Sequence, residues 1–176
     1  MKEEAMRTAL CLSTDATQIL VRHTEEASST KRRPCKKGHY FVQIADRDAV
    51  FFEYVERETS AAVMELFRGY EGYIQADAKN VYDILFREPD EPPDPDIEPD
   101  GKVRKEAGCW AHARRPWWDL YLSSKRDPDS LAAQALERIR ALYAIEEEIR
   151  GQRPEVRRAQ RQARAGPLLE EMHTWL

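Results

Sequence analysis

Two aspartates stand at positions where a carboxylate needs a chemical reason. Asp15 lies inside a β-rich segment, residues 6–22, and Asp77 ends the short apolar segment 72–77. Aspartate is disfavoured in strands, so each position asks for an explanation. Taken alone, each residue is more typical of a turn that ends a strand. Taken together, they supply two carboxylates at strand positions, where they could share a ligand.

A third acidic residue, Glu146, lies in the longest predicted helix. At about 100° per residue, Glu146 falls in the centre of an apolar stripe, whereas Glu147 lies at its edge. A carboxylate aimed at a core costs several kcal/mol unless it is paired or binds a metal. A pairing with an inward arginine, or a shifted helix register, would explain the same pattern without chemistry. The stripe consists of Leu131, Ala135, Ile139, Leu142 and Ile149.

Asp15, Asp77 and Glu146 together form a ligand set for two Mg²⁺ ions, for which Mn²⁺ can substitute. Mg²⁺ prefers hard oxygen ligands and keeps several waters. Two such ions can clamp the attacking and the leaving oxygen of an in-line phosphoryl displacement. The three acids therefore predict a metal-dependent phosphoryl-transfer site.

The elements that would hold these acids indicate an α/β fold with a mixed sheet. Residues 39–45 and 49–55 are rich in aromatic and β-branched side chains and predict a hairpin around a turn at 46–48. A helix capped by Thr59 or Ser60 follows and ends near Gly69, then a strand over 72–77 and a helical segment. Another strand is predicted at 107–111, and a loop at 23–38.

The second half of the chain is predicted to be mainly helical. Asp127 and Pro128 open a helix to Arg150, and Pro154 can start another, which Gly166–Pro167 should break. Residues 88–101 contain five prolines and seven acids and predict an extended, solvated loop. We expect one domain over residues 1–176, with this loop as an insertion and a basic helical segment at 150–176.

The composition narrows the class of protein. The chain has 176 residues, of which 41% are hydrophobic and 34% charged, and a net charge of −4. These values fit a globular protein, and no apolar stretch is long enough to span a membrane. The N-terminus lacks a secretory signal, so we expect a cytoplasmic protein. Three widely spaced cysteines without a CxxC pair argue against disulfides and a zinc ribbon.

Several segments resemble transposases of the insertion-sequence-66 family. They include LCLSTDATQILV, GYIQAD, GCWAHARR and LYAIE, and the resemblance covers nearly the whole chain. It implies an RNase H-like catalytic domain of the DDE type, in which Asp15, Asp77 and Glu146 bind the metal ions. It also implies cleavage of a DNA strand at the element's end, followed by attack of the freed 3′-hydroxyl on target DNA. Glu147 is the alternative third carboxylate.

Two groups of basic residues are candidates for contacting DNA. Arginines recur every three or four residues from position 150 and form one helical stripe, which is equally typical of a solvated face. His112, Arg114 and Arg115 follow a strand predicted near the site, where arginine could bind a phosphate in a bidentate manner. The stripe consists of Arg150, Arg153, Arg157, Arg161 and Arg164. We expect Trp110, Trp117 and Trp118 to be core residues rather than base-stacking platforms.

The resemblance also suggests a truncation at both ends. Members of the family carry an N-terminal helical and zinc-binding region and continue beyond the PLLEEMHTWL segment. We therefore expect a catalytic-core fragment whose partners are DNA and full-length transposase. The alternatives are an inactive remnant that only associates with intact transposase, and a standalone nuclease of the same fold.

Overall fold

The chain forms two compact units, Met1–Cys109 and Trp110–Leu176. The computed structural model describes residues 1–22, 35–46, 48–87, 91–92 and 94–176. The expectation of one domain over residues 1–176 stays a prediction.

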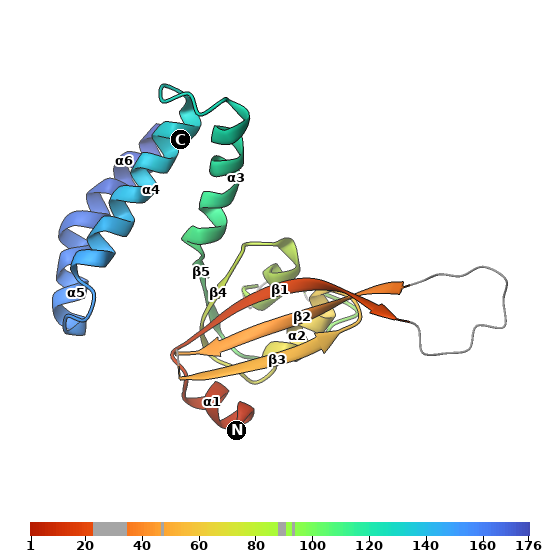
Figure 1. Cartoon of the computed structure of the whole chain (residues 1–176). Helices are drawn as coiled ribbons and strands as arrows, with labels where there is room; N and C mark the ends of the chain where they lie inside the picture. Colours follow the sequence, from red (N-terminus) through yellow and green to blue (C-terminus); the bar gives the residue numbers. More distant parts are fainter. Residues whose placement is uncertain (23–34, 47, 88–90, 93) are drawn as a thin grey trace. The chain divides into compact units, whose positions relative to one another are not determined.

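A five-stranded mixed sheet with the order β3-β2-β1-β4-β5 forms the first unit (Figure 1). Strands β1, β2 and β3 pair antiparallel, whereas β4 runs parallel to β1 and β5 runs parallel to β4. This topology, with its helices, is the predicted RNase H-like α/β fold. The strands are β1 (Cys11–Arg22), β2 (Cys35–Ala45), β3 (Ala49–Val55), β4 (Gly72–Ala76) and β5 (Arg104–Gly108).

The predicted hairpin is confirmed as β2 and β3, which pair from His39–Val55 to Ala45–Ala49. Asp46 in its turn has a φ of 48° and accepts hydrogen bonds from the Leu10 and Cys11 amides. The prediction of a loop over 23–38 was wrong for residues 35–38, because they pair with the end of β1 and extend β2. Residues 23–34 of that loop, with the basic run 31–33, lie outside the described residues.

The helical segments of this unit are α1 (Lys2–Thr8), α2 (Ser60–Phe67) and the 3₁₀ segment η1 (Asn80–Leu85). The extended conformation predicted from residue 6 was wrong for residues 6–8, which complete α1 and bury Met6. Thr59 is confirmed as the cap of α2, since its hydroxyl accepts a hydrogen bond from the Ala62 amide. The strand predicted at 107–111 begins earlier, at Arg104, and ends before α3 starts at Trp110.

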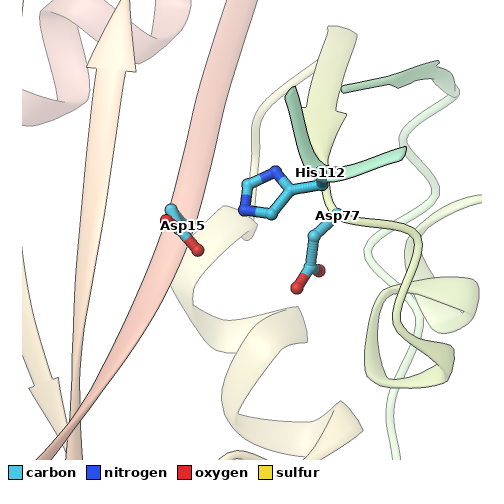
Figure 2. A group of neighbouring side chains, drawn as sticks. All are labelled: Asp15, Asp77 and His112. Atoms are coloured by element: carbon cyan, nitrogen blue, oxygen red, sulfur yellow. The ribbon is translucent and has the colours of Figure 1, made fainter. Parts of the chain in front are cut away.

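Strand alternation separates the core from the opposite face of the sheet. Leu12 and Phe41 are fully buried and belong to one cluster with Val63 and Phe67 of α2. Since side chains alternate along a strand, Asp15 lies on the other face of β1 and is exposed (Figure 2). The sheet therefore places its apolar side chains against α2 and leaves the acidic residue accessible.

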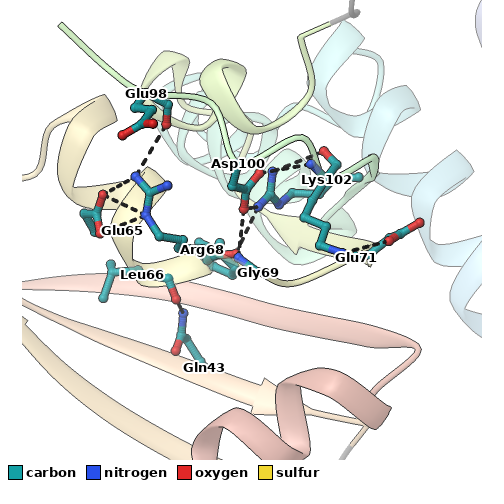
Figure 3. A network of polar contacts seen from close by, with 11 residues as sticks. Gln43, Glu65, Leu66, Arg68, Gly69, Glu71, Glu98, Asp100 and Lys102 are labelled. Atoms are coloured by element: carbon teal, nitrogen blue, oxygen red, sulfur yellow. Dashed lines mark hydrogen bonds and ion pairs between the residues drawn. The ribbon is translucent and has the colours of Figure 1, made fainter.

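The end of the acidic, proline-rich loop is buried rather than solvated. Asp100 accepts hydrogen bonds from the amides of Gly69 and Lys102 and pairs with Arg104, whose side chain is 2% exposed (Figure 3). Arg104 also donates to the Phe67 carbonyl at the end of α2. The prediction of an extended, solvated loop missed this contact. Asp100 is one of seven acids in residues 88–101, and nothing in the composition distinguishes it as the one with a buried arginine partner.

Removing the buried arginine should destabilise the protein more than removing an exposed cation next to it. We expect Arg104→Met to lower the free energy of unfolding by about 3–5 kcal/mol, because it leaves Asp100 buried without its partner. Lys102→Met is the matched control, since Lys102 pairs with Glu71 at 3.6 Å on the surface and should cost under about 1 kcal/mol. Urea denaturation measures both, and equal losses would contradict the buried ion pair.

The same contact predicts an acid-dependent stability. Burial by itself raises the pKa of Asp100, but hydrogen bonds from Arg104 and two backbone amides hold it below its ordinary value. A carboxyl whose pKa is lower in the folded state stabilises the fold above the unfolded-state pKa. We expect the free energy of unfolding to fall as the pH drops below about 4. Asp100→Asn should show a smaller fall over that range, and an unchanged acid dependence would contradict this assignment.

Among the described residues of the second unit, every regular element is a helix. The long predicted helix is confirmed as α4, but Ser130 rather than Asp127 caps it, because the Ser130 hydroxyl accepts from the Ala133 amide. Asp127 instead accepts from the Asp129 amide in the preceding turn. The helices are α3 (Trp110–Ser123), α4 (Leu131–Glu148), α5 (Pro154–Gln160), η2 (Arg161–Ala165) and α6 (Gly166–Trp175).

The break predicted at Gly166–Pro167 does not occur. The π-helical segment η2 joins α5 directly to α6, which begins at Gly166. The Gly166 amide donates to the Arg161 carbonyl, five residues earlier, so the chain stays helical up to Pro167 through a local π-turn. The expectation that the tryptophans of α3 are core residues was also wrong, since this helix has no buried residue and Trp118 is 39% exposed.

Candidate functional site

The centre of the sheet positions Asp15. Strand β1 lies between β2 and β4, and Asp15 stands opposite Val42 of β2. Its neighbour Thr14 points into the core, so the alternation of the strand turns Asp15 to the opposite face. At Asp15 itself β1 pairs with β2, and its pairing with β4 covers Cys11–Ser13, so the strand is held on both sides just before this residue.

Asp77 directly follows β4, the parallel neighbour of β1. Ser13 pairs with Gln75, and the Ser13 hydroxyl contacts the Gln75 side-chain oxygen at 3.1 Å on the same face of the sheet. Asp15 and Asp77 each lie two residues after this pair, so the register places both side chains on the same face of the sheet. Their carboxylates offer oxygen atoms within 4.8 Å of each other (Figure 2). The structure therefore brings two of the three predicted acids together.

The environment of Asp77 fits a cation. Its side chain is only 13% exposed, and one oxygen, Oδ2, lies 3.3 Å from the Lys79 ammonium. The other oxygen, Oδ1, is buried and has no hydrogen-bond partner among the described residues. Burial, and then the charge of Asp77, raise the pKa of the nearby Tyr82 phenol, which stays protonated. A buried carboxylate oxygen without a donor is a costly arrangement that a bound cation would relieve.

Glu146 lies in the second unit and is held by arginine. Arg161 donates two hydrogen bonds to its carboxylate, at 2.6 and 2.7 Å, and Arg157 lies 3.6 Å away. The Arg161 contact holds the pKa of Glu146 below its usual range. The pairing with arginine, which was the alternative explanation for its position, is thus the arrangement that this unit adopts. Metal binding by Glu146 stays a prediction.

The apolar stripe of α4 keeps four of the five predicted residues, since Ala135, Ile139, Leu142 and Ile149 are all buried. Ile145, rather than Glu146, occupies the buried position between Leu142 and Ile149. Glu146 lies beside the stripe with a side chain that is 40% exposed, and Leu131 at the start of the helix is 64% exposed. The helix begins its buried face one residue later than the sequence suggested, at Ala132.

The basic stripe faces the acidic end of α4 within the same unit. Besides Arg157 and Arg161, Arg164 pairs with Glu148 at 2.6 Å, and Arg150 pairs with Glu147 at 2.5 Å. Arg153 is exposed at the start of α5. Part of the positive charge that we expected to meet DNA is therefore offset by neighbouring carboxylates, and the contact with DNA stays a prediction.

The candidates of the GCWAHARR segment lie in the first turns of α3. The Arg114 guanidinium stacks 5.1 Å from the centre of the Trp118 ring, and Arg115 is exposed. His112 follows Cys109, whose amide donates to the Ala76 carbonyl at the end of β4. DNA binding by these three residues stays a prediction.

Two residues of the site were missed in the sequence. Lys79 contacts both Asp77 and the Glu58 carboxylate, which is 3.1 Å from its ammonium and only 17% exposed. The spacing Asp77–Lys79 is visible in the sequence as QADAK, but nothing there indicates that the chain turns back on itself. Glu58 precedes the cap of α2 and gives no periodic signal.

A mixed sheet of this order is typical of an RNase H-like domain, and here it carries one aspartate on β1 and another directly after β4. Residues 2–176 match the Transposase IS66 family, and the chain belongs to this family. The predicted family resemblance is therefore confirmed over almost the whole chain.

One curated protein of Sinorhizobium fredii (strain NBRC 101917 / NGR234) is similar to this chain. It is described as "Uncharacterized protein y4hP", and it is 37% identical over 79 residues, which cover 40% of this chain and 14% of the relative. No solved structure matches the chain. Among the described residues, no helix is both long and apolar enough to cross a membrane.

Proposed function

We propose that this chain is the catalytic core of a DNA transposase that cleaves a DNA strand at the end of a mobile element and transfers it to target DNA. The observation that carries the proposal is the pair Asp15 and Asp77, whose carboxylate oxygens lie within 4.8 Å of each other on one face of the sheet. Membership of the IS66 family supports a DNA substrate.

Asp15 and Asp77 are the residues that would hold a divalent cation, and Glu146 is the proposed third ligand. Two neighbouring carboxylates repel each other, and one buried oxygen of Asp77 has no donor among the described residues, so the pair suits a hard cation such as Mg²⁺ or Mn²⁺. When bound, two such ions would stabilise the charge on the attacking and leaving oxygens.

The chain's own residues would position the phosphate and offset its charge. In cleavage, a water oxygen forms a bond to phosphorus, the bond from phosphorus to the 3′ oxygen breaks, and the water's proton passes to that oxygen. In transfer, the freed 3′-hydroxyl attacks a target phosphate and a new 3′-hydroxyl leaves. Arginines in α3 and in the stripe from Arg150 to Arg161 would bind flanking phosphates. His112 is the proposed neighbour of the scissile phosphate.

Glu146 would have to exchange its arginine for the cation in the active state. Arg161 and Arg157 would then be released from the carboxylate and become available for DNA phosphates. The proposal thus gives both the acid and the arginines a role, and it requires that they separate when DNA and metal bind.

A Mn²⁺-dependent nicking assay on supercoiled DNA tests the proposal. The wild-type chain is compared with Asp77→Asn at equal concentration and folding. Equal nicking by both would remove the enzymatic function, and no nicking by either would favour a non-catalytic chain that only associates with intact transposase. Cleavage without joining of a 3′ end to target DNA would favour a standalone nuclease.

A further inference from the structure

A turn directly after Asp77 folds Lys79 back onto the site. Ala78, the residue between them, has a φ of 57°, in the left-handed region that side chains other than glycine rarely adopt. Backbone strain of this kind persists where the surrounding structure imposes it, often at functional sites. Its effect here is to bring the Lys79 ammonium within 3.3 Å of the Asp77 carboxylate, two residues away.

Glu58 fixes the lysine from the other side. Its carboxylate lies 3.1 Å from the Lys79 ammonium, and its side chain is only 17% exposed. The second oxygen of Glu58 lies 3.9 Å from the His39 imidazole on β2. The Lys79 ammonium therefore links the segment before α2 to the turn after β4.

The lysine ammonium can bind one more oxygen. An ammonium has three N–H donors, and Glu58 and Asp77 are two partners for them. The Lys79 side chain is nevertheless 43% exposed, so a phosphate beside Asp77 can approach it from solvent. Lysine acts as a compact positive charge that suits a non-bridging phosphate oxygen.

We propose that Lys79 is a phosphate-positioning residue of this site and that Glu58 holds it there. The inference rests on the proposed function, because the phosphate in question is the DNA phosphate that would lie at Asp15 and Asp77. Lys79 stays beside Asp77 in the free protein, where it offsets the repulsion between the two aspartates. When DNA binds, the ammonium contacts the phosphate while Glu58 keeps its side chain from swinging away.

A purely structural lysine would behave differently. If Lys79 only linked Glu58 to Asp77, its removal would change the melting temperature and leave the affinity for DNA unchanged. If it contacts a phosphate, its removal weakens DNA binding and lowers the slope of log affinity against log salt by about one. The second result can be measured without catalysis and without a divalent cation.

The experiment compares Lys79→Met, Lys79→Arg and Glu58→Gln with Lys102→Met, which removes a lysine of similar exposure from the pair with Glu71. Binding of a fluorescent DNA duplex is measured in EDTA over a series of salt concentrations, and nicking is measured in Mn²⁺. Circular dichroism melting of every variant identifies any that fail to fold.

We expect Lys79→Met to weaken duplex binding about threefold to tenfold at low salt and to lower the slope of log affinity against log salt by about 0.9. Nicking should fall about 100-fold in this variant, about tenfold in Glu58→Gln, and less than tenfold in Lys79→Arg, which keeps the charge. Lys102→Met should match the wild type in all three measurements.

Failure of this proposal is distinguishable from failure of the proposed function. Wild-type nicking with unchanged DNA binding and salt slope in Lys79→Met would overturn the role of Lys79 and leave the function standing. No nicking by the wild type would overturn the function, while the salt slope would still decide whether Lys79 contacts phosphate. No duplex binding by the wild type, or equal defects in Lys79→Met and Lys102→Met, would overturn the assignment of Lys79.

Discussion

Asp77→Asn should reduce Mn²⁺-dependent nicking by at least roughly 1,000-fold. The substitution keeps the shape of the side chain and removes the charge that would bind the cation, and each 1.36 kcal/mol lost from transition-state stabilisation is a tenfold loss in rate. Asp15→Asn should have an effect of the same size, because both carboxylates lie within 4.8 Å and would share the ion. The rate of conversion of supercoiled to open-circular plasmid measures the loss.

Two controls separate this loss from damage to the fold. Asp83→Asn removes an exposed acid from η1, a few residues further along the chain, and should nick at the wild-type rate. Asp77→Asn itself should melt close to the wild-type temperature, because it removes both the repulsion between two neighbouring carboxylates and the ion pair with Lys79. If both aspartate variants still nick DNA at the wild-type rate, the pair does not hold the cation that the reaction needs.

Glu146→Gln should reduce nicking by about 100-fold to 1,000-fold, whereas Glu147→Gln should stay within about twofold of the wild type. The two acids are adjacent in α4, but only Glu146 is held by Arg161 and Arg157, whereas Glu147 pairs with Arg150 at the exposed end of the helix. Comparing the two variants in one assay decides which of them is the third carboxylate.

The stability of Glu146→Gln is the control, because this substitution also removes the ion pair with Arg161. Glu146 is 40% exposed, so losing its ion pair should lower the free energy of unfolding by no more than about 1 kcal/mol. A loss of nicking in a folded Glu146→Gln variant therefore reports on chemistry. If Glu147→Gln loses nicking instead, the assignment moves to the neighbouring residue, and if neither does, the site works with two carboxylates.

The sheet and its two aspartates could be predicted because their signals are local. Alternating aromatic and β-branched residues marked β2 and β3, and the poor fit of an acid to a strand drew attention to Asp15 and Asp77. That these two acids meet depends on the parallel pairing of β1 with β4, which no local pattern specifies. The family resemblance supplied this link, and the register from Ser13 to Gln75 supports it.

The parts that sequence reasoning missed depend on long-range or fine geometric effects. Glu58 and Lys79 meet because a strained turn at Ala78 reverses the chain, and no residue pattern announces a positive φ at alanine. Asp100 and Arg104 appear in the sequence as one acid and one base among many, and only burial distinguishes them. On α4, helical spacing from Leu142 and Ile149 fits position 145 as well as position 146. The structure buries Ile145 there and leaves Glu146 at the edge of the stripe.

The pairing of β4 with β1 also limits how the gene for this domain can vary in length. Ile74 faces the core and Asp77 faces the other side of the sheet, so one added or deleted residue between them would point the acid inwards and an apolar side chain outwards. The acidic, proline-rich connection before β5 has no such parity to keep, apart from the contact at Asp100. Insertions and deletions among relatives should therefore gather in that connection and be absent from the interval between Ile74 and Asp77.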